Sequence, residues 1–167
     1  DALYSGILVD TDNFVVKAGV RTFEAAAYLR RAGADVTRVR KMFREDMENC
    51  KIRAEIINRA ELFYDEFAIS TFDGRNIDGA TVIGAKAANA LLDVQGIRGS
   101  FVITQLSSCI YVSARSIDDL NVQIIMEKFG GGGHLTVAAA QLKDRTMGEV
   151  VNDLKNLLAS MKKEGDI

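Results

Sequence analysis

The chain has 167 residues, of which 48% are hydrophobic, and a formal net charge of -2 at pH 7. This length and apolar content suffice for one medium-sized or two small globular units with a buried core. The charge argues against a protein that holds long nucleic acid mainly through a basic surface, because such binding needs many Lys and Arg contacts to phosphates. No apolar run approaches the roughly 20 residues that cross a bilayer, so we expect no membrane span in this sequence.

The two cysteines, Cys50 and Cys109, lie far apart and form no C-x-x-C pair. Isolated cysteines of this kind fit a reducing cytosol, and we expect both to be packing residues. The amino terminus also lacks the basic start and apolar core of a secretory signal. A cytoplasmic location is therefore expected.

The amino-terminal stretch, residues 1–34, opens with an apolar run and reaches a polar turn at Asp10. A helix is expected from Thr22, as its N-cap, to Gly33, because an alanine run favours helix and glycine ends it. Residues 35–65 have helical apolar spacing, and their Arg and Lys residues alternate with Glu and Asp. This pattern predicts a connecting helical arm with a solvated charged face in preference to a nucleic-acid stripe.

The remaining residues, 66–167, alternate strand and helix patterns, which predicts a compact α/β unit. The expected elements are a strand at 67–72, a helix at 81–92, a hairpin of strands at 100–106 and 109–116, a helix at 120–129, a strand at 135–142 and a helix at about 146–163. Within the second hairpin strand, Tyr111, Ser113 and Arg115 share the polar face, since successive side chains point to opposite sides of a strand.

A run of four glycines precedes the only histidine of the chain, His134. Glycine reaches positive φ at little steric cost, so the amide groups of such a run can turn inward and line an anion site. Gly130, Gly131, Gly132 and Gly133 with His134 therefore predict a phosphate or nucleotide pocket. The alternative is a flexible connector, because glycine runs are also common in loops.

For three side chains near this run, binding competes with a structural role. Arg115 ends a strand and can hold a phosphate with two N–H groups or stack on a base, but a surface salt bridge is the alternative. Asn121 either caps the next helix or contacts a nucleotide edge, and we favour the second. His134 either binds the ligand or donates to a carbonyl as a structural histidine.

Several of these segments, taken together in their order and spacing, resemble a known family. The segments that resemble the DHHA1 domain are VSARS at 112–116, NV at 121–122, GGGGH at 130–134 and AAA at 138–140. The segments that resemble the end of a DHH catalytic domain are GILVDT at 6–11 and RTFEAA at 21–26. The combined match is similar to cyclic di-AMP phosphodiesterases of the GdpP type and covers nearly the whole chain.

The resemblance implies a fold and a domain plan. Residues 1–34 would be the C-terminal part of a DHH catalytic domain, and residues 35–65 a helical linker. Residues 66–167 would be a DHHA1 substrate-binding domain of the α/β class, with a mixed β-sheet flanked by helices.

The resemblance also implies a manganese-dependent phosphodiesterase that opens cyclic di-AMP to linear pApA with two metal ions, magnesium being the alternative ion. Asp10 would then be a metal ligand, since its carboxylate is a hard oxygen donor. By its chemistry alone, an Asp in this position is a turn or helix cap. Asp12 is expected to be a cap or a residue that contacts the metal ligands without binding the metal itself. In the family, the matching histidine and glycine loop contact the nucleotide phosphate or nearby groups.

The Asp-His-His triplet and the earlier metal motifs of a DHH enzyme do not occur in the sequence. The chain therefore resembles the C-terminal piece of a larger enzyme whose membrane helices would lie upstream, and we expect this piece alone to hydrolyse nothing measurable. Expected partners are the missing N-terminal part of the DHH domain and a cyclic dinucleotide or short oligonucleotide, with a homodimer left open. The alternatives are an exonuclease for short oligonucleotides, a nucleic-acid-binding DHHA1 module such as the tRNA-synthetase appendage, and a non-catalytic nucleotide-binding module.

Overall fold

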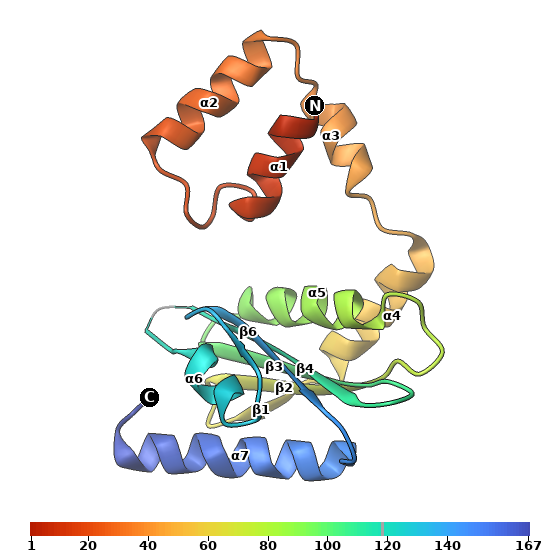
Figure 1. Cartoon of the computed structure of the whole chain (residues 1–167), viewed down its shortest axis with the longest axis vertical. Helices are drawn as coiled ribbons and strands as arrows, with labels where there is room; N and C mark the ends of the chain where they lie inside the picture. The colour runs from red at the N-terminus through yellow and green to blue at the C-terminus, as the bar shows by residue number, and fades with distance from the viewer. Residues whose placement is uncertain (118) are drawn as a thin grey trace. The chain divides into compact units, whose positions relative to one another are not determined.

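The computed structural model describes residues 1–117 and 119–167, which form two compact units, Asp1–Asp46 and Met47–Ile167 (Figure 1). The boundary falls inside the stretch that the sequence predicts to be one helical arm. Val39, from the first part of that stretch, is fully buried in the core of the first unit, whereas Ile56 is buried in the second. The arm is thus divided between two cores. None of the described helices is long and apolar enough to cross a bilayer.

The first unit consists of α1 (Ala2–Asp10), α2 (Val20–Arg31) and α3 (Val36–Met42) around a small core. That core contains Tyr4, Ala26, Ala34 and Val39, with Leu8, Phe14 and Leu29 packed against it. The expected N-cap at Thr22 is wrong, because α2 begins at Val20 with Gly19 as its N-cap. The backbone N–H of Thr22 instead donates to the carbonyl of Gly19 within the first turn.

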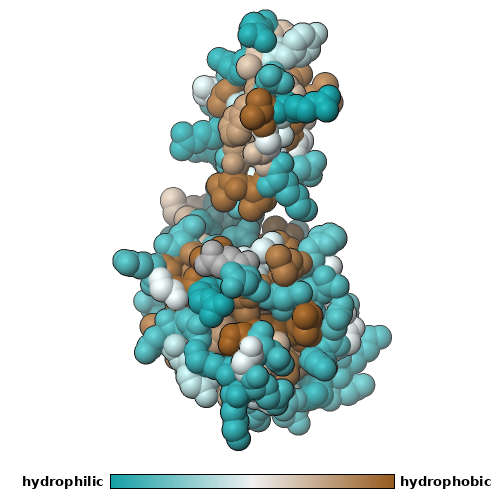
Figure 2. Space-filling model, turned by 90° about the vertical axis from the view of Figure 1, so that its left-hand side faces the viewer, coloured by the Kyte–Doolittle hydropathy of each residue, from teal (hydrophilic) through white to brown (hydrophobic). Residues whose placement is uncertain are grey.

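Large apolar side chains are exposed on both units, as Figure 2 shows in brown. Those of the first unit include Leu3, Val9, Val15, Val20, Tyr28 and Met42, each more than half exposed. A surface of this kind on a small unit is typical of a region that packs against further protein.

The second unit is built on a six-stranded mixed sheet with the order β1-β2-β3-β4-β6-β5. The strands are β1 (Glu61–Phe63), β2 (Phe67–Asp73), β3 (Gly99–Gln105), β4 (Ile110–Ser116), β5 (Gly132–Gly133) and β6 (Val137–Leu142). β2 and β3 are parallel and the other neighbours are antiparallel. The helices are α4 (Met47–Asn58), α5 (Ala80–Leu92), α6 (Val122–Glu127) and α7 (Met147–Glu164).

Helices cover both faces of this sheet (Figure 1). α5 connects the parallel strands β2 and β3, as a crossover between parallel strands requires, and packs with α4 on one face. α6 and α7 cover the opposite face, where Leu154 and Leu158 of α7 pack against Phe101 and Ile103 of β3. The α/β class with a mixed sheet flanked by helices is therefore confirmed.

The expected alternation of apolar and polar side chains along β4 is confirmed, and it places the two kinds of side chain on opposite faces of the sheet. Ile110, Val112 and Ala114 are buried in the core beneath α6 and α7. Tyr111 and Arg115 belong to the other face, and both are half-buried. The strand thus turns its polar side chains toward the face that α5 covers.

Two elements of the structure differ from the expected ones. Residues 35–65 are predicted to be a helical arm, but Glu61–Phe63 within them forms β1 and pairs antiparallel with β2. The helix expected at residues 120–129 is shorter and spans Val122–Glu127, since Asn121 caps its start.

The glycine run is the third difference, because part of it is strand. Gly132 and Gly133 form β5 and pair with Ala139 and Ala138 of β6. A Cβ atom on Gly131 would lie 2.1 Å from the carbonyl oxygen of Ala139, and a Cβ on Gly133 would lie 2.4 Å from that of Val137. These glycines are therefore required by close backbone packing against β6.

We predict that Gly131→Ala destabilises the second unit, because the new methyl group collides with the backbone of β6. Overpacking of this kind costs about 1–3 kcal/mol. Gly132→Ala is the matched control, since a Cβ there meets nothing within 4 Å, and we expect a change within about 0.5 kcal/mol. Thermal and urea unfolding of the two variants measure the difference. Equal stability of the two would show that close packing is not what requires Gly131.

Candidate ligand-binding pocket

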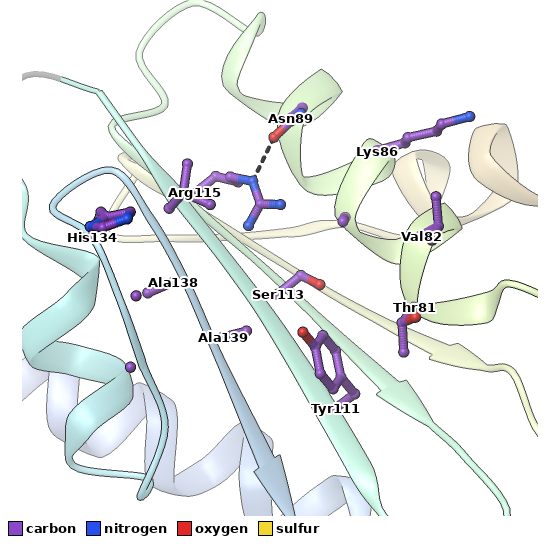
Figure 3. Close-up of a pocket in the computed structure, with 14 residues that line it drawn as sticks. Thr81, Val82, Lys86, Asn89, Tyr111, Ser113, Arg115, His134, Ala138 and Ala139 are labelled. Carbon is purple, nitrogen blue, oxygen red and sulfur yellow. Dashed lines mark hydrogen bonds between the residues drawn. The ribbon is translucent and has the colours of Figure 1, made fainter. Parts of the chain in front are cut away.

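A pocket of about 500 Å³ lies between α5, β4 and the β5–β6 turn (Figure 3). Its lining residues are Thr81, Val82, Ala85, Lys86, Asn89, Tyr111, Ser113, Arg115, Gly132, Gly133, His134, Val137, Ala138 and Ala139. The volume is within the range of about 300–1,000 Å³ typical of small-molecule sites. The lining is mostly apolar and includes no acidic side chain among the described residues.

Arg115 is held in this pocket by two hydrogen bonds. Its Nε donates to Oδ1 of Asn89 at 2.7 Å, and its Nη1 donates to the carbonyl oxygen of Ala114 at 2.9 Å. Burial lowers the pKa of the Arg115 guanidinium, and the nearby Tyr111 hydroxyl opposes this effect. An arginine stays protonated in proteins, so the group remains a cation at neutral pH.

The charge of Arg115 is not neutralised within the described part of the chain. No Asp or Glu of residues 1–117 and 119–167 forms an ion pair with it, whereas Arg75 pairs with Asp73 at 2.7 Å and Arg98 with Glu66 at 2.9 Å. The pocket is therefore suited to an anion.

Ser113 and Tyr111 lie beside Arg115 on the same face of β4 (Figure 3). Ser113 is only 1% exposed and lines the pocket. A ligand that bonds to its hydroxyl would add a hydrogen bond to the site. Val82, Val137 and Ala139 supply the apolar surface around these polar groups.

His134 lies at the rim of the pocket, directly after β5. Its backbone N–H donates to the carbonyl of Val137 at 2.7 Å, which closes the turn into β6. Its imidazole is exposed and makes no hydrogen bond to another described residue. The ring is therefore accessible to a ligand.

The expected anion site formed by inward-turned glycine amides is wrong in its geometry. The N–H of Gly130 donates to the carbonyl of Glu127 at 3.0 Å, and that of Gly131 to the carbonyl of Met126 at 2.9 Å. These amides close the end of α6, and neither glycine lines the pocket. Of the run, only Gly132 and Gly133 do so, which brings them together with His134 and Arg115.

The favoured role of Asn121, contact with a nucleotide edge, is also not what the structure shows. Its side-chain oxygen accepts hydrogen bonds from the backbone N–H groups of Gln123 at 3.0 Å and Ile124 at 3.4 Å. Asn121 is thus the N-cap of α6, and it does not line the pocket. The structure shows the capping role, and a contact of Asn121 with a nucleotide edge stays a prediction.

Asp10 is exposed at the last position of α1, in the first unit. Asp12 follows in a turn where it adopts a positive φ of 43°. Among the described residues, no group of three or more His, Cys, Asp or Glu side chains could hold a metal ion. Asp10 alone would supply a single carboxylate, so its metal-binding role stays a prediction.

Sequence reasoning did not identify the contribution of α5 or assign a role to Ser113. Thr81, Val82, Ala85, Lys86 and Asn89 line the pocket and recur at helical spacing, so they share one side of α5. The polar residues that lie among small residues on this side of α5 could have indicated a binding surface. The sequence alone does not show which strand this side of α5 faces.

The second unit is a mixed α/β domain with a largely apolar pocket that contains the Arg115 cation. The chain belongs to the DHHA1 domain family, whose model matches residues 67–164. This finding confirms the resemblance seen in the sequence.

The relatives that match most of the chain include two cyclic-di-AMP phosphodiesterases. The cyclic-di-AMP phosphodiesterase PdeA of Listeria monocytogenes is 46% identical over 92% of the chain, and the cyclic-di-AMP phosphodiesterase GdpP of Geobacillus thermodenitrificans is 45% identical over 94%. The chain spans only 23% and 24% of these two proteins. The solved structure of an exopolyphosphatase-related protein from Bacteroides fragilis matches with a TM-score of 0.84 at 18% identity, over 94% of this chain and 48% of its own. It shows the shared fold.

We predict that Arg115→Met weakens binding of phosphate-bearing ligands to this pocket, because it removes the cation while keeping the apolar stem. A hydrogen bond to a charged group is worth about 1.5–3 kcal/mol, so affinity should fall at least about tenfold. Arg75→Met is the matched control, since Arg75 is exposed, paired with Asp73 and outside the pocket. Calorimetric titration with pApA measures both. An equal loss in both variants would contradict the assignment of this pocket.

Proposed function

We propose that the chain is the nucleotide-binding part of a phosphodiesterase that opens cyclic di-AMP to linear pApA. The observation that carries this proposal is Arg115, a half-buried cation with no carboxylate partner in the described chain, set in a mostly apolar pocket. A phosphodiester supplies the complementary anion, and a nucleobase suits the apolar walls. The names of the PdeA and GdpP relatives support cyclic di-AMP as the substrate.

In this proposal each polar group of the pocket has a distinct part in binding. Arg115 donates from its guanidinium to phosphate oxygens, and the exposed imidazole of His134 donates from the rim. Ser113 offers a hydroxyl from the same face of β4. Tyr111 and Val82 bound the space for a base. These contacts orient the dinucleotide but do not hydrolyse it.

We also propose that the hydrolytic centre uses manganese, with magnesium as the alternative ion, and that most of its ligands come from other parts of a longer protein. When bound, such ions activate water and neutralise charge on phosphoryl oxygens. Asp10 is the residue of this chain that would contribute a carboxylate. In support, the chain spans about a quarter of its relatives, and the first unit leaves large apolar side chains exposed.

The substrate class is tested by titrating the chain with cyclic di-AMP, pApA and a longer linear oligoadenylate. We expect saturable binding of the two dinucleotides and no gain in affinity with length, because a pocket of about 500 Å³ holds only a small ligand. A clear preference for the longer linear chain would favour the exonuclease alternative. If none of the three binds, the proposed function is wrong.

We predict that the 167-residue chain alone does not turn over cyclic di-AMP in the presence of Mn²⁺. The reason is that its described residues bring no three metal ligands together. Chromatographic detection of pApA is the measurement, and addition of the preceding part of the longer protein is the control that should restore activity. Release of pApA by the chain alone would refute the division of roles proposed above.

A further inference from the structure

Asn89 is the one side chain of α5 that holds Arg115. Its Oδ1 accepts from Nε of Arg115 at 2.7 Å, while Nη1 of the same guanidinium is fixed to the carbonyl of Ala114 at 2.9 Å (Figure 3). These two anchors fix the plane of the group. Nη2 has no hydrogen-bond partner in the described chain, so it remains available to a ligand.

The contact between Asn89 and Arg115 requires α5 to lie close to the sheet, and the sequence provides for this. A Cβ atom on Gly84 of α5 would lie 2.7 Å from Oγ1 of Thr104 on β3, closer than real contacts allow. Glycine at this position lets the helix approach the sheet. Asn89, just over one turn later on the same helix, is thereby brought to the edge of the pocket.

The partner of Arg115 is also neutral, which matters for the charge of the site. An amide oxygen accepts a hydrogen bond without cancelling the positive charge, whereas a carboxylate of nearly the same shape would form an ion pair. A carboxylate would also repel an incoming phosphate.

We infer that Asn89 is a positioning residue that orients the guanidinium of Arg115 toward an anionic ligand and leaves its charge uncompensated. This inference rests on the proposed function, and it adds a specific requirement: position 89 must be a neutral acceptor. It assigns Asn89 no contact with the reacting atoms.

The test compares Asn89→Asp with Asn89→Ala in the 167-residue chain, using pApA and cyclic di-AMP as ligands. Alanine removes one hydrogen bond, so affinity should fall roughly 2- to 10-fold. Aspartate keeps an acceptor but adds a negative charge, so affinity should fall at least about tenfold further, because like charges oppose binding. The salt dependence of binding should also decrease, since less net positive charge faces the ligand. Asn156→Asp, an exposed residue of α7 on the opposite side of the sheet, is the control for net charge.

A double-mutant cycle separates orientation of Arg115 from any direct effect of Asn89. In the Arg115→Met background, Asn89→Ala should cause no further loss, because its effect passes through Arg115. Thermal unfolding of every variant checks the fold, and the alanine cycle remains decisive if the aspartate variant is unstable.

The outcomes distinguish this inference from the proposed function. If the parent chain and Asn156→Asp bind neither dinucleotide, both are wrong. If they bind, but Asn89→Asp binds as tightly as Asn89→Ala or the cycle shows independent effects, the positioning role alone is overturned.

Discussion

The close approach of the glycine segment to β6 is the constraint on which the pocket depends. Gly131 and Gly133 lie where any side chain would collide with carbonyl groups of the neighbouring strand. Since β5 can pair with β6 only under this condition, the glycines determine the path of the turn that follows. That turn brings His134 to the rim of the pocket that Arg115 lines. The glycines thus act mainly by allowing the backbone to pass close to β6. The amides of Gly130 and Gly131 donate to carbonyl groups at the end of α6.

Much of the fold follows from periodicity, because burial of one face imposes a repeat on the residues. The alternation from Ile110 to Arg115 identified a strand and its two faces, and the spacing after Thr146 identified the long final helix, which Thr146 and Glu149 cap reciprocally. The two strands that the repeat does not reveal are those in which it is short. β1 has three residues and β5 has two, so neither contains enough residues to show a period.

The site was predictable only in part, because it depends on contacts between distant residues. Arg115 and His134 were identified from their chemistry and from the resemblance, and both line the pocket. An asparagine before a helix suits both a cap and a ligand contact, and the structure shows that Asn121 caps α6 and does not line the pocket. Asn89 was missed because its partner lies 26 residues away in the chain. No local pattern reveals such a pairing.

The short strands at the two edges of the sheet also bear on how this unit behaves at high concentration. A long, flat edge would present a row of unpaired N–H and C=O groups to which strands of other molecules could add. Here the outer positions are taken by Glu61–Phe63 and by Gly132–Gly133, neither long enough to form such a row. The pairing that shapes the pocket therefore also guards the sheet against aggregation.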